Sequence, residues 1–153
     1  MRAVAAVAFA LLLLACRAAD ARPATPLPHA TLTIDTAHGP VQFDVEVAGD
    51  GASQERGLMF RTKLAPDAGM LFDFHQPVMT DFWMKNTILP LDIIFIRANG
   101  TISTVHADAV PYSLATIPAA EPVRAVLEIN GGRAKALGIV PGARVHEAIF
   151  EGQ

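Results

Sequence analysis

The segment 82–92 reads FWMKNTILPLD and combines the only tryptophan of the chain with several polar residues. Apolar neighbours on both sides predict that Trp83 and Leu91 are buried. Polar side chains between buried residues must find hydrogen-bond partners or face a cleft, because an unpaired buried polar group costs free energy. This segment is therefore the first candidate for a functional site. Its polar members are Lys85, Asn86, Thr87 and Asp92.

Apolar alternation around this segment predicts further short strands. The run 91–96 is the most strand-like, and Asn99-Gly100 is expected to supply the two positive φ angles of a two-residue turn. Two short helices are expected, one capped by Ser53 and one at 133–137 that ends at Gly138. The other predicted strands are 32–35 and 41–47, which form a hairpin, then 70–74, 82–84, 101–106, 123–129 and a last one within 139–150.

These elements predict a mainly β (β-rich α+β) fold. We expect a compact single-domain barrel or sandwich of about seven or eight short strands with two short helices. Long helices and β-α-β units are not indicated, so a doubly wound nucleotide-binding fold is not expected. Residues 109–122 contain three prolines and little periodicity, which is typical of a surface loop.

The N-terminus has the pattern of an export signal. Residues 3–14 form an unbroken apolar run after Arg2, and this run is too short to span a bilayer as a helix. It ends at Leu13-Leu14-Ala15-Cys16, which resembles the lipobox of bacterial lipoproteins. The resemblance implies a lipid on Cys16 and a location in the bacterial cell envelope, on the periplasmic or outer side of a membrane.

We therefore predict a signal peptide at 1–15, a lipid-anchored Pro/Ala-rich tether at 16–30 and a folded domain at 31–153. The alternative is ordinary secretory cleavage after Ala21, which would leave a soluble periplasmic or secreted protein. Cys16 is the only cysteine, so the domain is expected to rely on packing rather than on disulfides.

Composition and charge limit the classes of partner. The formal net charge is −3, and Lys and Arg are scattered along the chain. A nucleic-acid partner is not expected, because it needs a clustered basic surface. The five histidines stand apart in the sequence, so neither a metal site nor a cofactor is expected.

Several ordered motifs closely resemble the domain-of-unknown-function 192 family over about residues 32–148. The resemblance implies a compact β-rich domain, often exported in bacteria, with no established activity, so it indicates the fold rather than the function. The motifs are ERGLMFR at 55–61, GMLF at 69–72, FWMKNT at 82–87, PLDIIF at 90–95 and VLE at 126–128, with Gly132 and Leu137-Gly138.

Five polar residues of these motifs come from four segments and are expected to converge on one pocket. They are Arg56, Lys85, Asn86, Asp92 and Glu128, with Thr87 beside them. The structural alternative is that Arg56 pairs with Asp92 or Glu128 and that Asn86 ties strand ends. Trp83 and Tyr112 would be either an aromatic wall for a ligand or, for Trp83, a core anchor.

The favoured interpretation is a non-catalytic module of the cell envelope that binds a small ligand or a protein. One alternative is a hydrolase acting on glycan or lipid-linked sugar, with Asp92 and Glu128 as a close acid/base pair. A second alternative is Cu(I) binding by methionine thioethers. A third is a structural module that docks through a β edge or an apolar patch. The sequence contains no familiar catalytic motif.

Overall fold

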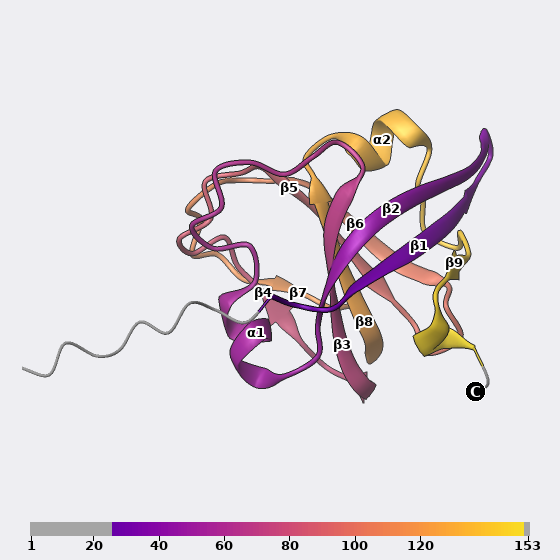
Figure 1. Ribbon diagram of the computed structural model, residues 1–153, viewed down its shortest axis with the longest axis horizontal. Helices are drawn as coiled ribbons and strands as arrows, with labels where there is room; N and C mark the ends of the chain where they lie inside the picture. Colours follow the sequence, from indigo (N-terminus) through magenta and orange to yellow (C-terminus); the bar gives the residue numbers. More distant parts are fainter. Residues whose placement is uncertain (1–25, 152–153) are drawn as a thin grey trace, which may run out of the picture.

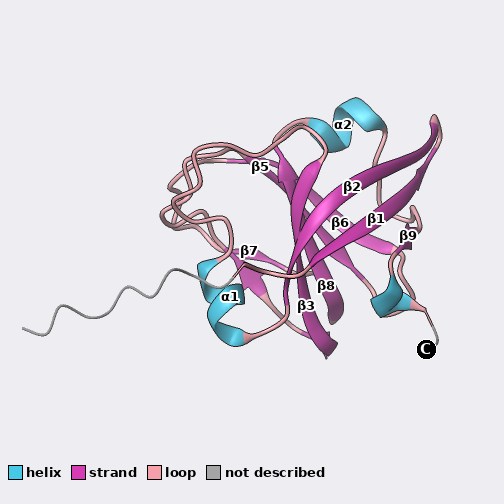
Figure 2. Ribbon diagram, viewed as in Figure 1, coloured by secondary structure: helices cyan, strands magenta, loops and turns pink. Residues whose placement is uncertain are grey.

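The computed structural model describes residues 26–151, which form two β-sheets with short helices at their margins (Figure 1). The strands are β1 (His29–Thr36), β2 (Gly39–Ala48), β3 (Ala68–Val78), β4 (Asp81–Phe82), β5 (Leu91–Ile96), β6 (Ile102–Ala109), β7 (Ile117–Pro118), β8 (Val123–Asn130) and β9 (Val145–His146). The helices are α1 (Gly51–Arg56), α2 (Arg133–Leu137) and the single 3-10 turn η1 (Ala148–Phe150). The mainly β class predicted from the sequence is confirmed (Figure 2). The predicted signal peptide and Cys16 lie outside the described residues.

The larger sheet has the strand order β6-β5-β8-β3-β2-β1-β9 and curls into a half barrel (Figure 1). β2 and β3 pair in parallel and are connected by the short crossover helix α1. The other neighbouring strands of this sheet pair in antiparallel fashion. The sequence did not predict this parallel pair, because a six-residue helix gives too weak a pattern to indicate a crossover. β4 and β7 form a small second sheet.

Each face of the large sheet is covered by its own apolar cluster, and β8 contributes to both. Alternate residues of a strand point to opposite faces, so Leu127 and Ile129 lie on one face and Val126 and Glu128 on the other. The first face includes side chains of β1, and it packs against Ala134 of α2 and against the C-terminal segment. The second face packs against Leu58 and the segments around β4 and β7. The sheet therefore separates two environments.

Helix α1 is capped by Asp50 and not by Ser53 as predicted. The Asp50 carboxylate accepts hydrogen bonds from the backbone N–H groups of Ala52 and Ser53, both at 3.0 Å. The Ser53 hydroxyl in turn accepts from the Asp50 N–H at 3.3 Å, which completes a capping box. Asp50 is a common N-cap residue type, but the glycine that follows it made the first residue of the helix hard to predict.

The β5–β6 turn also differs from the predicted two-residue turn. Only Gly100 has a positive φ, 78°. A Cβ at Gly100 would lie 2.8 Å from the backbone oxygen of Val145, so a larger residue would collide with the C-terminal segment. Instead, the side-chain oxygen of Asn99 accepts a hydrogen bond from the N–H of Thr101 at 3.0 Å. Packing against β9 therefore favours a turn that is wider than the predicted two-residue turn.

Candidate functional site

A cavity of about 440 Å³ opens on the second face of the sheet, between α1, β4 and β8. Its volume is within the range typical of small-molecule sites. Aromatic rings form much of its wall, and polar groups stand at its floor and rim. The aromatic members are Phe72, Phe74, Phe82 and Trp83. The other lining residues are Gln54, Glu55, Arg56, Gly57, Leu58, Met59, Thr80, Asp81, Thr87, Thr116 and Glu128.

Glu128 is a buried carboxyl group at this cavity. The β8 register places it opposite Met70 of β3 and Ile93 of β5, two residues of the apolar cluster. Its side chain is nearly inaccessible, and its Oε2 atom has no hydrogen-bond partner among the described residues. Burial raises the pKa of Glu128 to about 8, because the ionised carboxylate would be poorly solvated there. At neutral pH the group is therefore predominantly a neutral acid that can both donate and accept a hydrogen bond.

Trp83 lies at the rim of the cavity, so the prediction that it is buried as a core anchor is wrong. Its side chain is 45% exposed, and the Lys85 ammonium lies 5.0 Å from the centre of its ring. β4 ends at Phe82, whose edge packs against Phe72 with ring centroids 5.0 Å apart. Phe82 takes the core position that the sequence analysis assigned to Trp83. The prediction that Leu91 is buried is correct.

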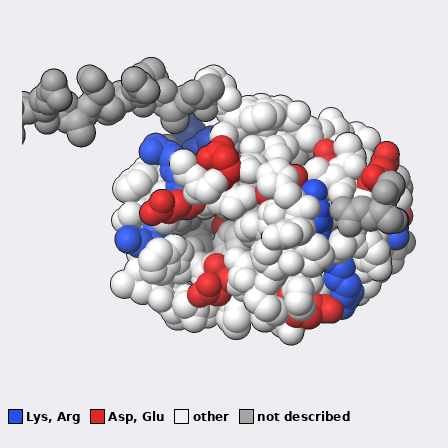
Figure 3. Space-filling model, turned by 90° about the horizontal axis from the view of Figure 1, so that it is seen from below, with Lys and Arg blue, Asp and Glu red and all other residues white. Residues whose placement is uncertain are grey.

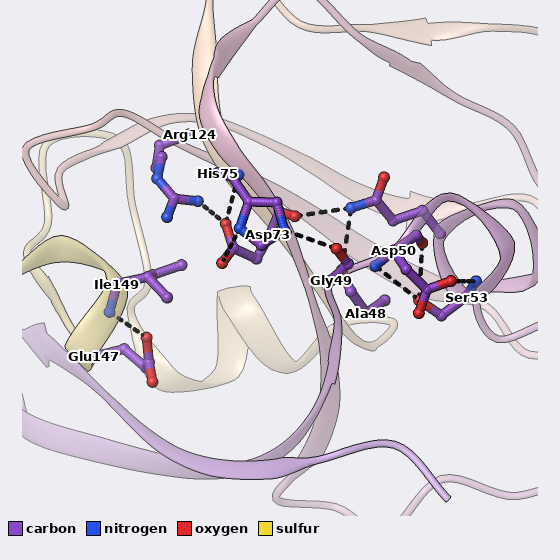
Figure 4. Close-up of polar contacts among 10 residues, drawn as sticks. Ala48, Gly49, Asp50, Ser53, Asp73, His75, Arg124, Glu147 and Ile149 are labelled. Carbon is purple, nitrogen blue, oxygen red and sulfur yellow. Dashed lines mark hydrogen bonds and ion pairs between the residues drawn. The ribbon is translucent and has the colours of Figure 1, made fainter. Parts of the chain in front are cut away.

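Helix α1, which carries Arg56, is fastened over the cavity by polar contacts to two strands. Gln54 Nε2 donates to the backbone oxygens of Ala48, at 3.2 Å, and of Asp73, at 2.8 Å. The Asp73 carboxylate accepts the N–H of His75 at 2.7 Å and pairs with the buried Arg124, as Figure 4 shows. The two Gln54 hydrogen bonds hold α1 in place at the cavity mouth.

Asp92 lies outside the cavity and is a structural residue. Its carboxylate accepts three backbone N–H groups: Asp108 at 2.8 Å, Gly132 at 3.0 Å and Ala134 at 2.7 Å. It thereby joins β5 to the end of β6 and to the beginning of α2. The predicted role of Asp92 in a binding pocket is not supported, and no ion pair joins it to Arg56 among the described residues.

Of the other predicted site residues, only Thr87 lines the cavity together with Arg56 and Glu128. Lys85 is exposed beside the rim, whereas Tyr112 stands on the loop after β6 and is 58% exposed. Asn86 adopts a positive φ of 56°, and its backbone oxygen accepts the N–H of Phe60 at 2.8 Å. Asn86 thus joins two loops through its backbone, whereas the structural alternative expected it to tie strand ends.

The sequence analysis named Trp83 as a possible member of an aromatic wall, but it missed the phenylalanines of that wall and the second hollow. Phe72 and Phe82 lie in motifs that the sequence analysis quoted, but their aromatic character alone did not distinguish a cavity wall from a core. A second hollow of about 540 Å³ lies beside α1, and Arg56 borders both spaces. Its wall includes Leu27 and the ion pair between Arg61 and Glu46, whose closest atoms are 2.6 Å apart.

Metal binding finds no support in the described part of the chain. No cluster of three or more His, Cys, Asp or Glu side chains is arranged to hold an ion within residues 26–151. Met70 and Met84 are buried in the apolar cluster and Met79 is exposed, so the copper alternative gains nothing from the geometry. None of the described helices has the length and apolarity needed to cross a bilayer.

A family model described as "Uncharacterized ACR" matches residues 32–147, about three quarters of the sequence. The chain belongs to the DUF192 family. The match confirms the family resemblance drawn from the sequence motifs. The DUF192 motif residues Arg56, Trp83, Thr87 and Glu128 are among those that meet around the cavity. A comparison with curated proteins gave no match.

Two solved structures resemble this DUF192 domain closely. A protein from Sinorhizobium meliloti 1021, provisionally described as a transcription regulator, has 46% identity and a TM-score of 0.79, and the match covers 82% of this chain and 98% of the other. A protein of unknown function from Novosphingobium aromaticivorans DSM 12444 has 44% identity and a TM-score of 0.79, with 82% and 90% covered. The S. meliloti chain is therefore matched over almost its whole length.

Proposed function

We propose that this DUF192 protein is a non-catalytic binding module whose cavity takes a small, uncharged ligand with an apolar or aromatic body. The observation that carries the proposal is Glu128, a buried acid with an unpaired oxygen at a cavity with aromatic walls. An unpaired buried polar group costs free energy, and a ligand that hydrogen-bonds to it removes that cost. The rings of Phe72 and Phe82 supply the apolar contact area.

The protonation state of Glu128, at the floor of the cavity, determines which ligands fit. The neutral Glu128 acid can donate to a carbonyl, ether or hydroxyl oxygen, whereas an anionic ligand would meet no compensating cation at this depth. Arg56 is exposed at the mouth and can contact a polar end of the ligand that remains in solvent. Amides, alcohols and similar neutral molecules are therefore the expected class.

A hydrolase that uses Asp92 and Glu128 as an acid/base pair is not supported. The β5–β8 register pairs Asp92 with Ile129, so Asp92 and Glu128 point to opposite faces of the sheet. The Asp92 carboxylate is also occupied by three backbone amides. A mechanism that needs both carboxylates around one bond cannot be assembled from this arrangement.

The proposed setting is the bacterial cell envelope, with lipid on Cys16 as the anchor. Support comes from the apolar run at 3–14 and from the lipobox-like sequence that ends it. A role in nucleic-acid binding is not part of the proposal, because the net charge is −3. Mass spectrometry of the protein from bacterial membranes tests the anchor: the expected N-terminal residue is a diacylated Cys16. An unmodified N-terminus after Ala21 would favour the secreted alternative.

The single tryptophan provides a direct test of the cavity. Trp83 lines it, so the one indole N–H signal in a ¹⁵N correlation spectrum should shift when a ligand binds. Matched pairs of equal size, such as benzamide and benzoate, separate neutral from anionic ligands. We expect saturable shifts with neutral members at pH 6.5 and none with the carboxylates.

The variant Glu128→Leu should lose these shifts, whereas Glu151→Gln, a change at an exposed remote carboxylate, should not. Equal binding of both members of each pair would contradict the assigned ligand class. Binding that is unchanged in Glu128→Leu would contradict the assignment of Glu128.

A further inference from the structure

Three loops at one end of the molecule expose a group of large apolar side chains. The loops are 57–66, 83–90 and 110–116, and they lie together at the left of Figure 1. We define the apolar tip as five side chains on these loops. They are Phe60 (65% exposed), Ile88 (46%), Val110 (67%), Tyr112 (58%) and Leu114 (66%). The cavity proposed above does not include any of these five side chains among its lining residues.

Backbone hydrogen bonds join the three loops. The N–H of Phe60 donates to Asn86 at 2.8 Å, the N–H of Tyr112 donates to Thr87 at 3.1 Å, and the N–H of Met84 donates to Ser113 at 2.9 Å. Phe60 and Tyr112 both adopt positive φ angles, 64° and 61°, which is costly for bulky residues. The exposed position of these rings is therefore imposed by the structure of the loops.

The charge of the loops is opposite to that of the chain. The three loops contain Arg61, Lys63 and Lys85 and no Asp or Glu, although the whole chain has a net charge of −3. Lys63 and Lys85 are exposed, whereas Arg61 pairs with Glu46. In Figure 3 the outer edge of this end, at the left, is white and blue, and the red atoms lie farther inward. The tip thus combines apolar side chains with flanking cations.

The N-terminal segment reaches the domain at the same end. Pro26 and Leu27 line the hollow that also includes Arg56 and Arg61, next to loop 57–66. The 25 preceding residues, which contain the apolar run at 3–14, connect to the domain through this position. A membrane attachment at the N-terminus would therefore hold the apolar tip close to the same membrane.

We infer that the apolar tip inserts into the surface of a lipid bilayer with anionic headgroups. Aromatic and aliphatic side chains on projecting loops enter the headgroup and acyl boundary, and lysines beside them contact lipid phosphates. Because the three loops contain no acidic residues, they have no carboxylates that the anionic headgroups would repel. The five side chains of the apolar tip do not line the cavity, although the same loops border it, so membrane binding and ligand binding can be tested independently.

The test uses residues 26–153, which lack the predicted anchor and include all of the described structure, and circular dichroism first checks that this segment folds. Its partitioning is measured by co-sedimentation with vesicles of phosphatidylcholine alone or with 30% phosphatidylglycerol. We expect binding to the anionic vesicles, and a fall of at least tenfold in the partition coefficient for Phe60→Ser/Leu114→Ser, since each change removes one inserted apolar side chain. Lys63→Gln/Lys85→Gln should reduce binding to anionic vesicles toward the level on neutral ones.

The matched control is Met79→Ser/Val140→Ser, which removes two equally exposed apolar side chains outside the three loops. It should change the partition coefficient by less than twofold. Absence of binding by the unaltered domain at millimolar lipid, or an equal fall in tip and control variants, would overturn the inference. So would a dimer, detected by analytical ultracentrifugation, that only the tip variant dissociates, because the surface would then join two copies of the chain.

Discussion

Asp92 and Glu128 stand on the paired strands β5 and β8, yet their side chains point to opposite faces of the sheet. Asp92 binds backbone amides on the face covered by α2, and Glu128 faces the cavity below α1. Two carboxylates from neighbouring motifs therefore have unrelated tasks. One stabilises the fold, and the other gives the cavity its chemical character.

Asp92→Ala should destabilise the domain. The change leaves the amides of Asp108, Gly132 and Ala134 without their shared acceptor, and each buried donor left unsatisfied costs about 1–3 kcal/mol. Urea denaturation of the variant and the unaltered domain measures the difference. Asp92→Asn retains one acceptor oxygen and should lose less. A loss below about 1 kcal/mol for Asp92→Ala would contradict the structural role.

Stability should fall as pH rises between about 4.5 and 8. Below this window Glu128 is protonated in both the folded and the unfolded chain, so its contribution is fully present. Within the window the unfolded chain ionises at the ordinary pKa of 4.5 while the folded chain keeps the proton up to a pKa of about 8. The loss has an upper bound of about 5 kcal/mol and stops above pH 8.

Glu128→Gln supplies the control for this pH dependence, because the amide has a similar shape and does not titrate. Urea midpoints measured from pH 4.5 to 9 should decline less steeply for this variant than for the unaltered domain. Identical slopes for the two proteins would show that Glu128 does not retain its proton in the folded state.

Gly69→Ala should be strongly destabilising, because a Cβ there would lie 2.6 Å from the backbone oxygen of Glu128. β3 and β8 would have to separate, with an expected loss of about 2 kcal/mol or more. Gly51→Ala is the matched control, since nothing lies within 4 Å of its added Cβ and the residue is helical. It should be neutral or stabilising by up to about 1 kcal/mol. Thermal unfolding of both variants measures these effects.

Phe60→Gly should separate stability from membrane binding. Glycine tolerates the φ of 64° better than phenylalanine does, so the free energy of unfolding should stay the same or rise by up to about 1 kcal/mol. The same variant should bind anionic vesicles more weakly, because it lacks the exposed ring. A clear loss of stability would indicate that the Phe60 ring supports the loops instead of serving a partner.

The sequence predicted the strands best where apolar runs are long. Leu91 to Ile96 forms a strand as expected, and it is fully buried because both faces of the interior strand β5 are covered. The misplacement of Trp83 has a physical cause. Phe82 pairs with Ile117 in the small second sheet, and Ile117 lies in the proline-rich stretch 109–122, which gave no strand signal. A two-residue strand is too short to be recognised by alternation.

The site could be predicted only in part, because its assembly depends on strand register. Arg56, Thr87 and Glu128 were named from their motifs, and the structure places all three around one cavity. Asp92 has a carboxyl group like Glu128 and occupies an equally apolar strand, so its sequence context did not distinguish it. Only the pairing of β5 with β8 decides which face each carboxylate occupies.

The separation of the two sheet faces has an evolutionary consequence. Asp92, which anchors α2 and the end of β6, points to the opposite face of the sheet from the cavity. Exposed residues of the cavity rim, such as Arg56 and Trp83, can therefore change selectivity with little effect on the scaffold, since substitutions at exposed positions usually change stability little. Paralogues with a common backbone are thus free to diverge in the molecules that they recognise.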